Sequence, residues 1–332
     1  MRRRPTAVAT AIAVAVACTL TSAVDAERHD RIPRATGLGG CELLPAADAF
    51  HQRVDTMDVA ANSDAVIERI LADGGDRLHP DFGSNPRYGI PFEVVRPRQR
   101  KVPVRIRAYP DESDRGRQPI PRDARIEGGR RSDGDRHVLV LQRDGADADS
   151  DCRLIELYRA FPPRRHAKRG RWRADQVSVF DLGDTLPQRP LGWTSADAAG
   201  LPILPGLVRR SEVRAGEIDH AIRITFERTR RAYALPATHW ASDECGPNLP
   251  PMGVRLRLEA GYPLGGMSAD ARVIAEALKR YGAIVADNGS NFYITGASSR
   301  GWDDEALSDL KEVPGDAFEV VDTGAPVSDD CP

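Results

Sequence analysis

The feature that most constrains the fold is the succession of short apolar runs in the middle of the chain. Each run is a few residues long and ends at a cluster of proline, glycine or aspartate. Runs of this length between turn residues are typical of β-strands, whereas a core helix needs about ten residues or more. We therefore predict strands over these ranges: Phe92–Val95, Val102–Ala108, His137–Gln142, Arg153–Tyr158, Ser178–Leu182, His220–Phe226, Arg231–Leu235 and Val254–Ala260.

So many strands without intervening helices predict a mainly β protein with a β-sandwich or jelly-roll-like body. A few helices are expected beside it. Asn62 or Ser63 begins a short one over 64–72, and Ser268 caps a second whose apolar residues recur at helical spacing. Asp303–Lys311 reads as a third helix.

The C-terminal elements, residues 268–322, are expected to pack on one end of the body. The Asn288-Gly289 pair between two strand-like runs, 283–286 and 291–295, predicts a β-hairpin, and a last strand is expected at 318–321. No linker separates these elements from the rest, so residues 41–332 are read as a single domain.

The N-terminus has the layout of a secretory signal peptide. Three arginines precede an apolar stretch from Ala7 to Leu20, and small residues follow at Ala23 and Ala26. The apolar stretch is too short for a stable membrane span. We expect residues 1–26 to be removed and 27–40 to be a disordered leader. Lipid attachment at Cys18 is the weaker alternative.

Four cysteines remain beyond the signal segment: Cys41, Cys152, Cys245 and Cys331. An even count in an exported protein predicts disulfides, because the compartment is oxidising. Four cysteines allow three pairings, which the sequence does not distinguish. Our preference is Cys41 with Cys331, joining the two ends of the domain, and Cys152 with Cys245.

Several classes of function have no support in the chain. The formal charge is −2, so the concentrated positive face that nucleic-acid binding needs is not expected. The sequence has no P-loop, no GxGxxG fingerprint and no GxSxG elbow. No Cys or His cluster has zinc-ligand spacing, and we predict neither a metal nor a cofactor.

Long phrases of the chain resemble a family of secreted bacterial β-rich proteins that has no securely assigned activity. The phrases include GWTSADAAGLPILPGLVR from Gly192, GEIDHAIRIT from Gly216, PATHWAS from Pro236 and ALKRYGAIVADNGSN from Ala277. Because the matching phrases extend over nearly all of the mature chain, the resemblance implies secretion and a β-rich fold. It implies no reaction.

Candidate acid-base residues lie on two of the predicted strands. In a strand through Glu217, this carboxylate shares a face with Asp219, Arg223 and Thr225, while His220 lies on the opposite face among isoleucines. His137 begins another strand. If the two strands are neighbours, His137 and His220 meet, with Glu156, Tyr158 or Asp135 as a partner. We predict Glu217, His137 and His220 as catalytic.

Substrate contacts are predicted at aromatic residues that have polar neighbours. Trp193 lies near Asp197, and Trp240 follows His239. An indole ring stacks on the face of a sugar, and adjacent polar groups bind its hydroxyls; the alternative is that these tryptophans fill the core. Glu156 and Asp287 complete the predicted binding residues.

Together these features favour a secreted protein that binds or cleaves a polysaccharide of the cell envelope or the environment. The alternative is a non-catalytic structural or interaction protein of the cell envelope, in which the same histidines and tryptophans are core or surface residues. The first reading requires the predicted acid-base groups to converge where solvent reaches them.

Overall fold

The computed structural model describes residues 38–143, 152–163, 170–329 and 331. The predicted signal peptide, and all but the last three residues of the predicted leader, lie outside these ranges. Residues 35–332 form one compact unit, and everything below concerns this unit.

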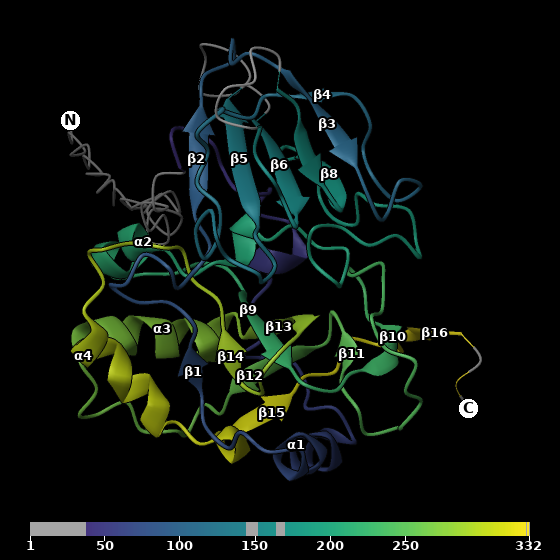
Figure 1. Ribbon diagram of the computed structural model, residues 1–332. Helices are drawn as coiled ribbons and strands as arrows, with labels where there is room; N and C mark the ends of the chain where they lie inside the picture. Colours follow the sequence, from purple (N-terminus) through teal and green to yellow (C-terminus); the bar gives the residue numbers. More distant parts are fainter. Residues whose placement is uncertain (1–37, 144–151, 164–169, 330, 332) are drawn as a thin grey trace, which may run out of the picture. The chain divides into compact units, whose positions relative to one another are not determined.

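Six strands build the largest sheet, in the order β1-β14-β9-β13-β12-β15 (Figure 1). Their bounds are β1 His79–Pro80, β9 Ile222–Phe226, β12 Arg255–Leu258, β13 Ala283–Asn288, β14 Tyr293–Ile294 and β15 Phe318–Val320. Alternate residues of β9 point to opposite faces, as strand geometry requires. Ile222, Ile224 and Phe226 join the main apolar core, while Arg223 and Thr225 point the other way. The sheet therefore has one polar patch beside β9.

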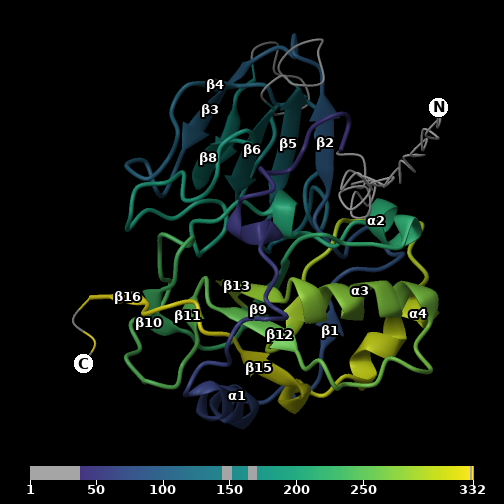
Figure 2. The same cartoon turned by 180° about the vertical axis from the view of Figure 1, so that it is seen from behind.

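Figures 1 and 2 show the helices of the unit close to this sheet. Helix α1 (Ser63–Ala72) packs near β15, and α3 (Ala269–Arg280) packs near β12 and α4 (Asp304–Ser308). The side chain of Ser268 accepts a hydrogen bond from the Ala271 amide, so the predicted cap of α3 is confirmed. The remaining α-helix of the described residues is α2 (Arg210–Ala215).

A second, four-stranded sheet has the order β2-β5-β6-β8. Its strands are β2 Phe92–Val95, β5 Val138–Arg143, β6 Cys152–Tyr158 and β8 Gln176–Asp181. Leu139 and Leu141 of β5 belong to the main core, and Val138 and Val140 belong to a second core. Because β5 is buried on both faces, its sequence is a continuous apolar run rather than an alternating one.

The second core also includes residues of a three-stranded sheet, β4-β3-β7. These strands are β3 Val102–Ile106, β4 Arg117–Gln118 and β7 Trp172–Ala174. The last sheet, β11-β10-β16, joins β10 (Arg230–Tyr233) to β11 (Pro251–Met252) and to β16 (Val327–Ser328) near the C-terminus.

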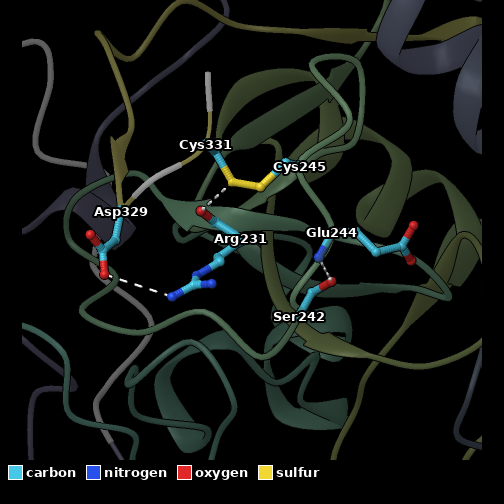
Figure 3. Close-up of a disulfide and its surroundings, with 6 residues drawn as sticks. All are labelled: Arg231, Ser242, Glu244, Cys245, Asp329 and Cys331. Carbon is cyan, nitrogen blue, oxygen red and sulfur yellow. Dashed lines mark hydrogen bonds and ion pairs between the residues drawn. A yellow bond between two sulfur atoms is a disulfide. The ribbon is translucent and has the colours of Figure 1, made fainter.

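Two disulfides are present, and their pairing differs from our preference. Cys41 bonds to Cys152, and Cys245 bonds to Cys331 (Figure 3). The ends of the domain are thus not joined to each other. Cys41, near the start of the domain, is instead bonded to a residue 111 positions later in the sequence, and Cys331, near its end, is bonded to a residue 86 positions earlier. Two disulfides fit an oxidising, extracellular environment. No helix in the described residues is long and apolar enough to cross a membrane.

The mainly β prediction is confirmed, and the predicted strands reappear with ends shifted by a few residues. The strands lie in four sheets, and their order does not establish a jelly roll. The predicted hairpin is wrong. Strands β13 and β14 do not pair with each other, because β9 lies between them and pairs with both. Residues 268–322 accordingly supply three strands to the central sheet.

Candidate functional site

Arg223 is the centre of the polar patch on the six-stranded sheet. Its side chain is only 3% exposed. Nε donates to Oδ2 of Asp197 at 2.7 Å, and one terminal nitrogen donates to Oγ1 of Thr295 at 3.0 Å. The other lies 3.9 Å from Oδ2 of Asp287. A buried guanidinium is tolerated only with such partners, so Arg223 fixes residues from three separate segments.

His137 lies just before β5, and both of its ring nitrogens face oxygen acceptors. Nδ1 is 2.7 Å from Oε2 of Glu127, and Nε2 is 3.0 Å from the carbonyl of Ala196. Burial acts to lower the pKa of His137, but the Glu127 carboxylate raises it to about 9. At neutral pH the ring is therefore an imidazolium that donates both hydrogens, and it cannot act as a base.

One loop connects these two cations. Ala196 accepts from His137, and the next residue, Asp197, accepts from Arg223. Asp197 also receives the Ala199 amide at 3.0 Å, and Ala199 is within hydrogen-bonding distance of the Ala286 carbonyl on β13. The loop is thus held against the sheet directly beside Asp287.

Four carboxyl groups surround this buried network at positions that solvent reaches: Asp81, Glu127, Asp135 and Asp287. We call them the carboxyl cluster. Asp81 and Asp135 are exposed, and the side chains of Glu127 and Asp287 are 25% and 26% exposed. Strand register places Asp81, which follows β1, beside Thr295 and hence on the face of Arg223.

The groups of the cluster differ in proton affinity. Burial, and then the nearby Asp197 carboxylate, raises the pKa of Asp287 to about 7. Partial burial and the charge of Glu127 raise the pKa of Asp81 to about 6. Burial acts to raise the pKa of Glu127, but protonated His137 outweighs it and holds this pKa below its ordinary value. Near neutral pH the cluster therefore contains both proton donors and ionised carboxylates.

Tyr158, at the end of β6, completes the site. Its ring centroid is 5.8 Å from that of His137. Burial and then the charge of Asp135 raise the pKa of Tyr158 to about 12, and the charge of Asp287 acts in the same direction. The hydroxyl stays protonated at all ordinary pH values, and it lies within electrostatic reach of both carboxyl groups.

Three predicted residues thus belong to this network: His137, Asp197 and Asp287. A fourth, Glu156, lies beside it but is completely buried. Its carboxyl oxygens accept the amides of Ile203 and Leu204 at 2.9 to 3.0 Å. Burial raises the pKa of Glu156 to about 7. Glu156 therefore stabilises the turn at Ile203 and Leu204, and its side chain is not accessible to a substrate.

Glu217 and His220 lie elsewhere. Both precede β9, which begins at Ile222, so the strand-face argument does not extend to them. The ring nitrogens of His220 face the carbonyl of Ala221 at 2.9 Å and a carboxyl oxygen of Glu212 at 3.2 Å. Glu217 is 28% exposed and 4.0 Å from Arg280. No hydrogen bond or ion pair in the described residues joins either one to His137.

The two predicted aromatic positions come together on neighbouring loops. The Gly192 amide donates to the carbonyl of Thr238 at 2.6 Å, and the Thr238 hydroxyl donates to the carbonyl of Trp193 at 2.8 Å. Nδ1 of His239 is 2.7 Å from the carbonyl of Ala198. Trp240 stacks on Tyr233.

Leucines project from both loops, with Leu191 61% and Leu235 57% exposed. We call Leu191, Trp193, Leu235, His239 and Trp240 the aromatic surface; its tryptophans and histidine are each partly exposed. The segment 193–199 borders this surface and also supplies Asp197 to the buried network. The aromatic surface and the buried network are therefore attached to one loop.

Sequence reasoning missed Asp81, Glu127 and the central role of Arg223. The available signal for Arg223 was a charged residue alternating with isoleucines in an otherwise apolar strand. Asp81 and Glu127 lie outside regular apolar runs and gave no signal of their own. Asp135 and Tyr158 were considered only as neighbours of His137.

No group of three or more His, Cys, Asp or Glu residues in the described part of the chain is arranged to hold a metal ion. Comparisons with protein-family models, with curated proteins and with solved structures find no match. The chemistry of the site must therefore be inferred from its geometry.

Proposed function

We propose that this is a secreted carbohydrate-active protein that hydrolyses glycosidic bonds in a polysaccharide of the cell envelope or the environment. The observation that carries the proposal is the carboxyl cluster, in which Asp287 has a pKa raised to about 7 while Glu127 stays ionised. Glycoside hydrolysis needs one protonated and one ionised carboxyl group at the same place.

In the proposed reaction Asp287 is the general acid. It gives its proton to the glycosidic oxygen as the bond from that oxygen to the anomeric carbon breaks. Glu127, which stays ionised and is 25% exposed, removes a proton from the attacking water, and the new hydroxyl forms on the anomeric carbon. Arg223 and His137 touch no substrate in this scheme; they position Asp287 and Glu127. The Tyr158 hydroxyl binds the sugar beside the reacting bond.

The aromatic surface supplies the binding part of the proposal. Partly exposed indoles beside a histidine suit the stacking and hydroxyl contacts that sugars make. We infer that a polysaccharide chain lies across Trp193 and Trp240 while one of its bonds reaches the carboxyl cluster. In this proposal, the predicted β-sandwich consists only of the four-stranded and the three-stranded sheet that contribute to the second core.

The test uses purified disulfide-bonded protein and a panel of soluble polysaccharides and cell-wall fractions. Release of reducing ends should be seen on at least one substrate, and Asp287→Asn should lower it by on the order of 10²- to 10⁴-fold, because the proton donor is lost. Asp243→Asn, on the loop after Trp240, is the matched control and should retain activity. Release that is unchanged in Asp287→Asn excludes this mechanism.

One observation favours a non-catalytic envelope protein. His137, His220 and Glu156 all have their polar atoms engaged by other protein groups, as structural residues do. Under this second candidate the protein is retained on some member of the panel without releasing fragments, and Trp240→Ala weakens that retention. Absence of both release and retention would reject the carbohydrate proposal.

A further inference from the structure

A separate pocket with both apolar and polar lining groups lies away from the carboxyl cluster and shares no residue with it. Its volume is about 270 Å³, the size of a small organic molecule. Most of the residues that line it are alanines, valines and prolines, together with Leu249. Such walls favour an apolar ligand body.

One cation faces this pocket without a partner. Arg230, the first residue of β10, lines the pocket. Its Nε is fully buried and has no hydrogen-bond partner. No ion pair or side-chain hydrogen bond joins its guanidinium to any other described residue. Because the guanidinium lines the pocket and has no acidic partner in the described residues, it can bind the carboxylate of a ligand.

The neighbouring arginines differ from Arg230 in their ion pairs, although Nε of Arg231 is also buried without a hydrogen-bond partner. Arg228 pairs with Glu244 and with Asp73, and Arg231 lies 3.7 Å from Asp329 (Figure 3). Asp322 also lines the pocket, but its carboxylate accepts the Gly324 amide and forms no ion pair with Arg230. Arg230 alone among these three arginines has no acidic partner in the described residues.

A second feature is the N-terminus of a helix, which has Asp64 in its first turn. Asn62, at the N-terminus of the ten-residue helix α1, lines the pocket, and its side chain makes no capping hydrogen bond. The first amides of a helix favour negative charge.

The remaining wall is the C-terminal segment 322–326. It is held in place because β16 pairs with β10, and Cys331 is bonded to Cys245 just beyond (Figure 3). The pocket is thus a built feature of the oxidised protein.

We propose that this pocket binds a small carboxylic acid with an apolar body, its carboxylate on Arg230 and its hydrocarbon part among the valines and Leu249. An inorganic anion would leave the apolar walls unused, and a neutral hydrocarbon would leave Arg230 unpaired. The pocket is independent of the proposed hydrolysis and binds its ligand with or without polysaccharide.

Isothermal titration of the oxidised protein with hexanoate, hexan-1-ol and hexylamine tests the proposal. Hexanoate should bind, hexan-1-ol should bind roughly tenfold to a hundredfold more weakly, and hexylamine should not bind measurably, because a charge-assisted hydrogen bond is gained only by the carboxylate. Arg230→Met should remove the preference for hexanoate over hexan-1-ol. Arg214→Met, an exposed arginine on α2, is the matched control and should bind like the wild type.

A second variant guards against misfolding of Arg230→Met. Leu249→Trp fills the pocket and leaves Arg230 in place, so it should abolish hexanoate binding while thermal unfolding remains cooperative. The proposal is overturned if hexanoate and hexan-1-ol bind the wild type equally, if neither binds, or if Arg230→Met keeps the wild-type affinity for hexanoate.

Discussion

At the scale of single residues, the structure separates groups that hold the protein together from groups that are able to react. His137 and Glu156 were both predicted at the site because a histidine and a carboxylate in apolar runs invite a catalytic reading. Hydrogen bonds to Ala196, Ile203 and other internal partners use up their polar atoms. Asp287 differs because it combines a raised pKa with an exposed edge.

Glu156 makes stability depend on pH in a definite direction. Its folded-state pKa, about 7, is above the ordinary value of 4.5, so the folded protein holds this proton more tightly than the unfolded chain. The contribution of Glu156 to the free energy of unfolding is therefore fully present below about pH 4.5, and it is lost as the pH rises through about 7.

We therefore predict that Glu156→Gln reduces the fall in unfolding free energy between about pH 5 and pH 8, by on the order of 2 kcal/mol. Glutamine cannot ionise and retains an acceptor for the Ile203 amide. Urea unfolding at both pH values measures the change, with exposed Glu68→Gln as control. An undiminished pH dependence in Glu156→Gln would show that this carboxyl group is not responsible.

At the scale of elements, β9 organises the site because it lies between β13 and β14 and brings Arg223 against Asp287 of β13 and against Thr295, which follows β14. The sequence predicted each of these strands but not their order. An Asn-Gly turn between two short apolar runs is a local hairpin signal. The insertion of β9 between those runs depends on long-range pairing, which no local pattern records.

The same dependence on long-range contacts explains why the sequence did not predict the disulfide pairing or all of the site residues. The cysteine count predicted two bridges, but which cysteines meet depends on the tertiary fold. Strand alternation correctly placed Arg223 opposite Ile222 and Ile224. Asp81 and Glu127 reach the cluster through loops whose course is set by the packing of distant segments, so a single sequence could not place them there.

Arg223→Met is predicted to destabilise the protein by about 3–5 kcal/mol, because it leaves Asp197 buried without its cation. The double variant Arg223→Met/Asp197→Asn should recover part of this loss, since the unpaired charge is then removed. Denaturant unfolding at pH 7 measures both, with Arg214→Met as the exposed control. If the double variant is less stable than the single one, an uncompensated charge is not the cause.

At the scale of the whole molecule, the candidate site draws on both main sheets. His137 and Tyr158 come from the ends of strands in the four-stranded sheet, while Arg223 and Asp287 belong to the six-stranded sheet. The loop 193–199 connects the buried network to the aromatic surface. This arrangement makes the proposed reaction dependent on the whole fold and not on any one local motif.

The most direct measurement is the pH dependence of reducing-end release on a substrate that the panel identifies. Because Asp287 must carry the proton that it donates, we predict that kcat/KM falls as the pH rises above about 7, the value to which burial raises the pKa of this group. Asp287→Asn should remove this fall together with most of the activity. A rate that instead increases through pH 7, or a wild-type profile retained in Asp287→Asn, would contradict the assignment of Asp287 as the general acid.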